Sequence, residues 1–188
     1  MTVSGPLSLL PNFISLARLL AVPVAVYLIL QGQLQAAFWI FVAAGISDAL
    51  DGYLAKRLGA ESEIGRYLDP LADKALLVGV YVALNHIDHL ATWLVFLVVF
   101  RDLLIIGGAI LFQTLTQSLK MAPLFISKIN TVAQITLASV VLGELGLGIE
   151  LAFLSEALLY IVALTTFVSG AAYIYKWGSL AVIMERDR

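Results

Sequence analysis

The chain has 188 residues, of which 61% are hydrophobic and 13% are charged, and its formal net charge is −2. Its mean hydropathy is +0.98. A soluble domain is about half apolar and a quarter charged, so this composition indicates an integral membrane protein. The lack of cysteine excludes disulfides, thiolate catalysis and cysteine metal sites, and we expect no nucleic-acid partner.

Six apolar segments follow one another, each near the ~20 residues that a membrane-spanning helix needs. They cover residues 12–30, 34–58, 64–85, 90–114, 124–147 and 151–174. The separators are too short to form another domain, so we expect an all-α bundle of six transmembrane helices. This bundle forms a single domain over residues 1–188. The prolines at positions 6 and 11 favour a short interfacial helix before the first span.

The basic residues predict the orientation in the membrane. With both termini inside, all eleven fall in or next to cytoplasmic segments: Arg18, Lys56, Arg57, Arg66, Lys74, Arg101, Lys120, Lys128, Lys176, Arg186 and Arg188. No basic residue precedes Arg18, which is unlike a secretory signal or an Arg-rich transit peptide. We therefore expect a multi-pass protein of a bacterial cytoplasmic membrane, with its active site facing the cytoplasm.

The first segment carries a polar stripe formed by Asn12, Ser15 and Arg18, which are three residues apart. Such a stripe on a spanning helix usually faces the bundle interior or a water-filled cavity. Alternatively, Arg18 extends its charge to the membrane interface.

Four aspartates mark the second and third segments. Asp48 and Asp51 precede a turn expected near residues 59–60, and Asp69 and Asp73 follow it. Folding both flanks as helices places the carboxylates in two tiers roughly 5 Å apart, each pair on one helix face. Two divalent ions would relieve the repulsion among them, and oxygen ligands favour Mg²⁺ or Mn²⁺. This stretch has no His or Cys, which argues against zinc.

The neighbours of these aspartates indicate phosphate chemistry. Gly52 and Gly65 allow close approach of a ligand or helix, and Lys56, Arg57 and Arg66 supply positive charge. Together these features favour phosphoryl transfer on a lipid-associated substrate. The residues alone leave two alternatives open, which are a proton or cation pathway in a transporter and a buried ion-pair network.

The pattern Asp48-x-x-Asp51-Gly52-x-x-Ala55-Lys56, followed by Gly65-x-x-x-Asp69-x-x-x-Asp73, resembles the signature of the CDP-alcohol phosphotransferases. The resemblance implies a two-metal centre on the four aspartates, with Asp73 also the general base, and a homodimer. It implies a binding site for the CDP-linked donor. The residues assigned to that site are Asn12, Arg18, Gly52, Ala55, Lys56, Gly65 and Arg66. Lys56 stands where the family has arginine, which leaves the charge but removes the planar fork.

The start of the fifth segment is the candidate acceptor region, with Ser127, Lys128, Asn130 and Thr131. A lysine near a helix N-terminus opposes the macrodipole, which indicates either an anion site or a membrane anchor. Arg101 is either paired with its neighbour Asp102 or part of the acceptor pocket.

Two stretches, PNFISLARLLAVPV and Phe-Ile-Ser-Lys-Ile-Asn-Thr, resemble the cardiolipin synthases of this superfamily. That branch uses CDP-diacylglycerol and phosphatidylglycerol and releases CMP. Phosphatidylglycerophosphate synthases, the nearest alternative, favour Gly-Lys-x-Lys-Thr and a further arginine, whereas residues 105–111 carry no charge. Glycerol 3-phosphate, a dianion, would need that cation more than the singly charged phosphatidylglycerol. The sequence therefore predicts a cardiolipin synthase, and a transporter is the distant alternative.

Overall fold

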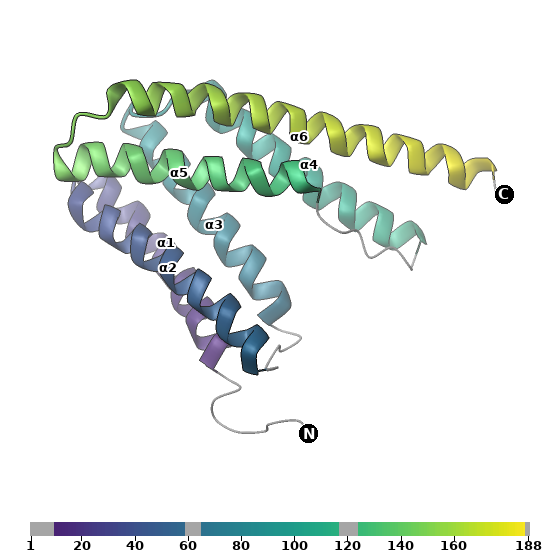
Figure 1. Ribbon diagram of the computed structural model, residues 1–188, viewed down its shortest axis with the longest axis horizontal. Coiled ribbons are helices and arrows are strands. Elements are labelled where there is room, and N and C mark those ends of the chain that lie inside the picture. The colour runs from purple at the N-terminus through teal and green to yellow at the C-terminus, as the bar shows by residue number, and fades with distance from the viewer. Residues whose placement is uncertain (1–9, 59–64, 117–123, 187–188) are drawn as a thin grey trace. The chain divides into compact units, whose positions relative to one another are not determined.

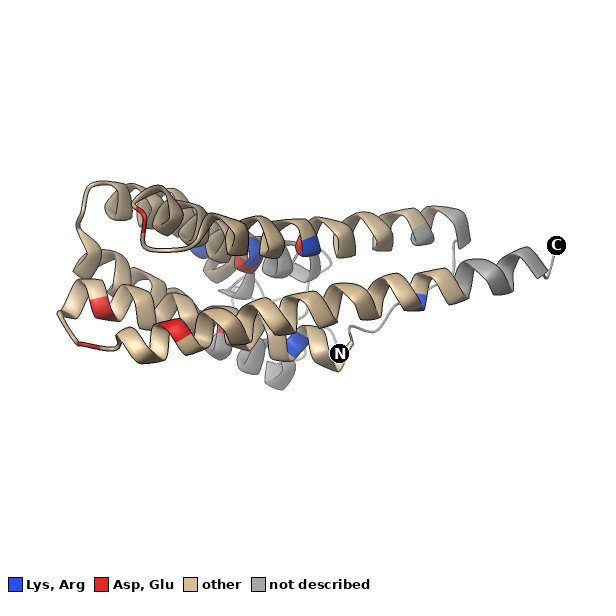
Figure 2. Cartoon of the chain, turned by 90° about the horizontal axis from the view of Figure 1, so that it is seen from above, with Lys and Arg blue, Asp and Glu red and all other residues tan. Residues whose placement is uncertain are grey.

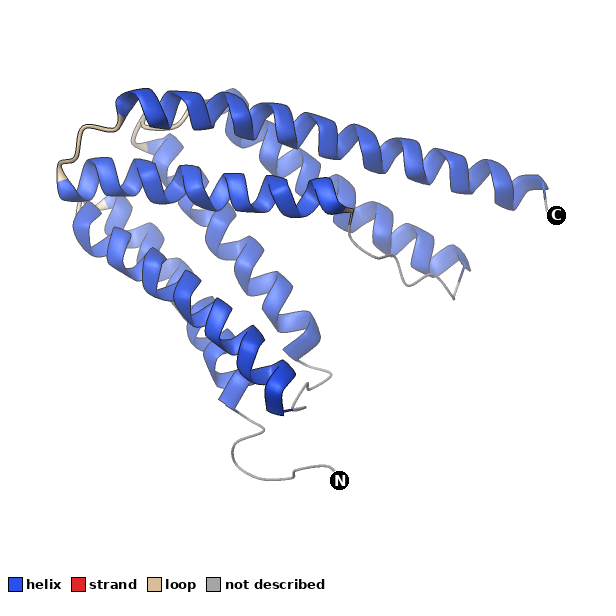
Figure 3. Cartoon of the chain, viewed as in Figure 1, coloured by secondary structure: helices blue, strands red, loops and turns tan. Residues whose placement is uncertain are grey.

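The computed structural model describes residues 10–58, 65–116 and 124–186, with side chains described for 14–48, 72–111, 114 and 124–179. These residues form helices joined by short turns and contain no strand (Figure 3). The expected all-α class is therefore confirmed. The helices are α1 (Leu10–Leu30), α2 (Leu34–Leu58), α3 (Gly65–His86), α4 (Thr92–Thr116), α5 (Phe125–Leu147) and α6 (Ala152–Arg186) (Figure 1).

The first five helices begin and end within two residues of the predicted segments. Helix α6 continues twelve residues beyond the predicted end at position 174. The prediction followed the apolar stretch, whereas a helix continues until its backbone is interrupted, and residues 175–186 contain no proline. The expected interfacial N-terminal helix lies in residues 1–9, outside the described part of the chain.

Three helices are long and apolar enough to cross a membrane within the described residues, over Thr92–Leu111, Phe125–Leu147 and Ala152–Ser179. Helices α1 and α2 contain shorter apolar stretches, Ile14–Leu30 and Leu34–Asp48. Six spans therefore stay a prediction, although the helical content and the apolar segments are those of a membrane protein.

The chain divides into two compact units. The first contains residues 1–90 and 138–151, and the second contains residues 91–137 and 152–188. In the first unit α1 packs against both α2 and α3, with Ala25 and Ile29 of α1 and Val80 and Leu84 of α3 buried. In the second unit α4 packs against α6. Helix α1 therefore packs against both of the helices that carry the four aspartates.

Helices α1 and α3 end in the same way. After α1, the Gln33 N–H donates to Leu28 O and the Gly32 N–H donates to Ile29 O. This pair of hydrogen bonds requires a residue in the left-handed conformation, which Gly32 supplies with φ 71°. Asp88 takes the corresponding position after α3, with φ 61°. The turn at Gly32 sets the short connection between α1 and α2 of the first unit.

The second unit is apolar outside and polar inside. Phe100 of α4 and Phe153 and Phe167 of α6 are more than 60% exposed, whereas Arg101 and Ser169 are buried. Figure 2 shows the charged residues of the described part of the chain as small patches on mostly uncharged stretches of helix. In a bilayer, polar side chains gather inside the protein and apolar ones face lipid, so this distribution fits a membrane environment.

Helix α5 approaches the start of α2 closely at Gly146, within the first unit. A Cβ added there would lie 2.7 Å from Leu34 O and 2.9 Å from Gln35 Cα. Backbone atoms cannot rotate away, so Gly146→Ala is expected to destabilise the protein by about 1–3 kcal/mol. Thermal unfolding in detergent measures the loss. Gly143→Ala is the matched control on the same helix, because its Cβ would make an ordinary 3.4 Å contact with Phe38. Equal melting temperatures for the two variants would show that this approach is not tight.

Candidate active site

Two residues of the polar stripe on α1, Ser15 and Arg18, face the interior of the first unit. Ser15 is fully buried and Arg18 is 2% exposed. The two residues are three positions apart and share one helix face, and α1 packs against both α2 and α3. The alternative that Arg18 extends to the membrane interface is therefore wrong.

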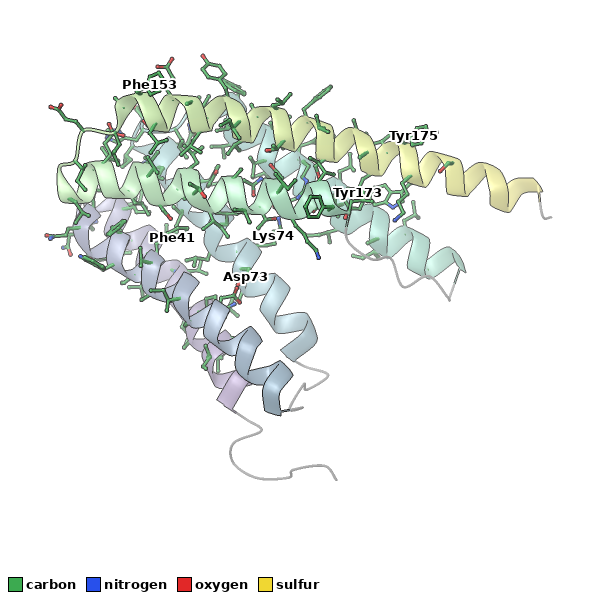
Figure 4. The ribbon with its side chains drawn as sticks, in the orientation of Figure 1. Phe41, Asp73, Lys74, Phe153, Tyr173 and Tyr175 are labelled. Atoms are coloured by element: carbon green, nitrogen blue, oxygen red, sulfur yellow. The ribbon has the colours of Figure 1, made fainter. Side chains whose placement is uncertain are left out.

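Arg18 connects α2 and α3 through their aspartates. Its Nη1 donates to Oδ1 of Asp48 at 2.6 Å and to Oδ1 of Asp73. Figure 4 shows the Asp73 side chain leaving α3 on the side of α1 and α2. We call Arg18, Asp48 and Asp73 the aspartate site. One nitrogen atom thus contacts carboxylate oxygens from two helices, so the two acids lie close together.

The aspartate site is closed on one side and open on the other. The Arg18 side chain is 1% exposed, whereas those of Asp48 and Asp73 are 45% and 42% exposed. The buried guanidinium binds both carboxylates from within the helix group. Their remaining oxygen surface is accessible to a second ligand, such as a cation or a phosphorylated molecule.

The donor set of the aspartate site fits a divalent metal. Two carboxylates on different helices already converge on one positively charged group, as the ligands of a hard cation do. Among the described side chains, no three His, Cys, Asp or Glu residues form a cluster. Asp51 and Asp69, the other two acids of the predicted set, are outside those side chains.

For the remaining predicted residues of the metal centre and the CDP-donor site, the structure describes only the backbone. Asp51, Gly52, Ala55 and Lys56 lie in α2, on the turns that follow Asp48. Gly65, Arg66 and Asp69 lie in the first turns of α3, and Asn12 lies in the first turn of α1. Their side chains are outside the described part of the chain, so their roles stay predictions. The sequence order nevertheless puts all of them on the same three helices as the aspartate site.

A second polar group, the Arg101 cluster, lies in the second unit and consists of Arg101, Asp102, Ser127 and Ser169, all of them buried except Ser127, which is half-buried. Arg101 Nη1 donates to Asp102 Oδ1 at 2.6 Å. Its Nη2 donates to Ser127 Oγ at 2.5 Å and to Ser169 Oγ at 2.6 Å. The two alternatives for Arg101 are thus compatible, because it pairs with Asp102 and also reaches a residue of the predicted acceptor region.

Next to it on α5 and α6 is the Asn130 cluster, formed by Asn130, Thr165 and Thr166. Both threonine hydroxyls donate to Asn130 Oδ1 at 2.9 Å. Asn130 is fully buried, and its Nδ2 has no hydrogen-bond partner among the described residues. A buried amide donor is normally satisfied, so this group is available to an oxygen atom of a bound molecule.

The other two predicted acceptor residues lie differently. Lys128 is exposed and Thr131 is partly buried, and the Thr131 hydroxyl donates to the backbone oxygen of Ser127. Gln134, which follows Thr131 by three residues on α5, is by contrast fully buried. The buried polar residues of α5 are Asn130 and Gln134.

The sequence reading did not assign the partners on α6. Thr166, Ser169 and Tyr173 are buried, and the Tyr173 hydroxyl accepts a hydrogen bond from the Leu124 N–H. Their three- and four-residue spacing places them on one helix face. Polar residues with that spacing in an otherwise apolar span are the signal that would have found this face.

Comparisons with known proteins identify the family of the chain. A family model described as CDP-alcohol phosphatidyltransferase matches residues 8–168, which include the aspartate site and the Arg101 cluster except Ser169. The chain is 37% identical over 186 residues to CDP-diacylglycerol–glycerol-3-phosphate 3-phosphatidyltransferase 1, chloroplastic, of Oryza sativa subsp. japonica, covering 89% of the chain and 56% of the relative. It is 30% identical over 194 residues to human cardiolipin synthase (CMP-forming), covering 95% and 64%.

A third relative is closer in length. The chain is 31% identical over 171 residues to the CDP-diacylglycerol–glycerol-3-phosphate 3-phosphatidyltransferase of Rickettsia typhi, covering 87% of the chain and 94% of the relative. By contrast, it spans 56% and 64% of the rice and human relatives. The matched region contains the whole spaced pattern from Asp48 to Asp73. From this match we conclude that the chain belongs to the CDP-alcohol phosphatidyltransferase family.

Proposed function

We propose that the protein transfers a phosphatidyl group from CDP-diacylglycerol to phosphatidylglycerol, which yields cardiolipin and CMP. The observation that supports this most directly is the convergence of Asp48 and Asp73 on one cation in the first unit. Two acids of a spaced signature, brought together from different helices, are what a donor site for a pyrophosphate requires. A transporter pathway has no need of that signature or of its glycines.

Asp48, Asp51, Asp69 and Asp73 are the proposed ligands of two divalent ions, Mg²⁺ or Mn²⁺. When bound, such ions neutralise the pyrophosphate of the donor and polarise the phosphorus that is attacked. Asn12, Arg18, Gly52, Ala55, Lys56, Gly65 and Arg66 are the proposed donor-binding residues. Asp73 accepts the proton of the acceptor hydroxyl, whose oxygen then bonds to the phosphorus farther from cytidine. The bond from this phosphorus to the CMP oxygen breaks, and CMP leaves.

The acceptor residues are proposed to be Arg101, Ser127, Lys128, Asn130 and Thr131. Two features of the second unit support an acceptor of low charge. Asp102 already neutralises Arg101, and the groups around Arg101 and Asn130 are hydroxyls and amides. The unsatisfied Nδ2 of Asn130 can donate to one neutral or singly charged oxygen. Phosphatidylglycerol, with hydroxyls and one phosphodiester charge, suits such groups better than a dianion.

Phosphatidylglycerophosphate synthase is the second candidate. The rice and Rickettsia relatives carry that activity in their names, and the chain matches the rice protein at 37% identity. Lys128 has an exposed side chain and could supply positive charge to glycerol 3-phosphate. The relatives thus support either acceptor, and only the acceptor distinguishes the two reactions.

The setting of the reaction is also proposed. One domain over residues 1–188 is supported by a family match that extends over both units. A site on the cytoplasmic face of a bacterial cytoplasmic membrane is supported by the one-sided distribution of Lys and Arg. A homodimer rests on the family resemblance.

One assay tests the proposal. The purified full chain in detergent receives CDP-diacylglycerol and Mn²⁺ or Mg²⁺, and each acceptor is offered separately. We expect CMP release with phosphatidylglycerol and a lipid product with the mass of cardiolipin. Release with glycerol 3-phosphate alone would replace the proposed acceptor, and no CMP with either would reject the donor chemistry. A chelator should stop the reaction, and added Mn²⁺ should restore it.

A further inference from the structure

We infer that Arg18 is a positioning residue of the metal centre, because it holds Asp48 and Asp73 together in place of a divalent ion and is displaced when the ion binds. The inference rests on the proposed metal-dependent function. It goes beyond that function because it gives the protein its own cation for the metal-free state and predicts a competition between the two cations.

Arg18 contacts both aspartates through the same atom. A single atom, Arg18 Nη1, contacts Oδ1 of Asp48 and Oδ1 of Asp73. A divalent ion shared by the same two acids needs lone pairs on those carboxylates. An ion that bridges the same two Oδ1 atoms takes the position that Nη1 holds between them, so Arg18 must release at least one of these oxygens when the ion binds there.

Arg18 is buried, whereas the two aspartates are partly exposed. The Arg18 side chain is 1% exposed, and both carboxylates are more than 40% exposed. The guanidinium therefore approaches from inside the helix group, and the metal and its substrate can approach only from the open side. A cation held on the inner side keeps two like charges on α2 and α3 from repelling each other before the metal arrives.

Competition with Arg18 weakens the apparent affinity of the site for metal. If the site accepts metal only after Arg18 has withdrawn, the apparent dissociation constant rises by the inverse of the fraction already withdrawn. Arg18 bonds both acids, so this fraction is small. Removing the guanidinium should therefore tighten metal binding, whereas a residue that only supports the fold would leave the affinity unchanged or weaken it.

The test uses Mn²⁺ binding to the purified full chain without donor, measured by electron paramagnetic resonance of free Mn²⁺. The variants are Arg18→Met and Arg18→Gln, which both remove the charge, and Gln keeps a polar side chain. Lys74→Met is the control for simple loss of charge, because Lys74 follows Asp73 in α3. Figure 4 shows the two side chains leaving that helix in different directions.

We expect Arg18→Met to bind Mn²⁺ about tenfold more tightly than the wild type, as removal of a competing state populated at about 90% predicts. Metal-free Arg18→Met should melt at a lower temperature than the wild type, and Mn²⁺ should raise its melting temperature by more. Lys74→Met should change the affinity less than Arg18→Met. If Arg18→Met does not fold, Arg18→Gln is the readout, and it should also bind more tightly than the wild type.

Two results would overturn the inference while the proposed function stands: wild-type binding of Mn²⁺ with an unchanged or weaker affinity in the Arg18 variants, or an equal gain in Lys74→Met. A wild-type protein that binds no Mn²⁺ at saturating concentration would overturn the metal centre of the proposed function and this inference together.

Discussion

Asp73→Asn is expected to lower CMP release by about 10³-fold or more while the protein remains folded, because a general base contributes roughly 10²–10⁴-fold and this residue is also a proposed ligand. Asparagine keeps the shape of the side chain but cannot accept the hydroxyl proton. It also loses the charge that bonds Arg18. The measurement is initial-rate CMP release at saturating CDP-diacylglycerol and acceptor, with the melting temperature as the test of folding.

A metal titration separates the two roles of Asp73. Asp48→Asn removes a proposed ligand that is not the base, so its activity should recover partly at high Mn²⁺. The activity of Asp73→Asn should not recover at any concentration. Asp88→Asn is the matched control, because Asp88 is an exposed acid in the left-handed turn after α3, and asparagine tolerates that conformation. Near-normal turnover by Asp73→Asn would remove this residue from the base role.

The helices could be predicted because their lengths and separators are local features. Gln31-Gly32-Gln33 ends one apolar segment, and Gly32 provides the left-handed residue that the turn requires. The end of α6 could not be predicted in this way. Hydropathy reports where a segment leaves the apolar phase, and the helix of residues 152–186 continues through a more polar end.

The aspartate site was partly predictable for a related reason. Asp48 and Asp73 are at similar distances from the turn between α2 and α3, so helical rise alone places them level. The structure brings them to one nitrogen of Arg18. The bond to Arg18 depends on how α1 is rotated against two other helices, which is a long-range property. The stripe of Ser15 and Arg18 indicated an interior face but not its partners.

The polar groups of the second unit were harder to foresee. Arg101 and Ser127 were singled out from the sequence, but Arg101 also donates to Ser169 of α6, which was not. Residues 68 positions apart meet only because α4 packs against α6. A serine or threonine in an apolar span gives a weak signal by itself, since its hydroxyl can also bond to its own helix backbone. Thr165 does so, with the backbone oxygen of Ile161.

Arg101→Met is expected to destabilise the protein by about 3–5 kcal/mol, which is the usual cost of breaking a buried ion pair by removing one partner. Asp102 is 5% exposed and would remain buried without the cation that neutralises it. Ser127 and Ser169 would each lose a hydrogen bond from Arg101. Thermal unfolding in detergent measures the effect, and Gly107→Ala is the control on α4, because its Cβ would meet no atom within 4 Å.

The double variant Arg101→Met with Asp102→Leu separates folding from acceptor binding. Replacing both members of a buried pair by apolar residues is often neutral, so most of the lost stability should return. The acceptor contact should not return. We therefore expect kcat/KM for phosphatidylglycerol to stay at least ~100-fold below the wild type, which corresponds to about 2.7 kcal/mol of lost transition-state binding. Mn²⁺ affinity should be unchanged, because neither substitution alters a proposed metal ligand.

The outcome of the double variant decides what the Arg101 cluster is for. Restored stability with normal use of phosphatidylglycerol would make the cluster a fold element and move the acceptor site elsewhere. Restored stability with lost acceptor use, at unchanged Mn²⁺ affinity, would assign the cluster to the acceptor. If apolar residues can replace this buried pair without loss of stability, the pair has a role other than stabilising the fold. In a transferase, binding the acceptor hydroxyl is such a role.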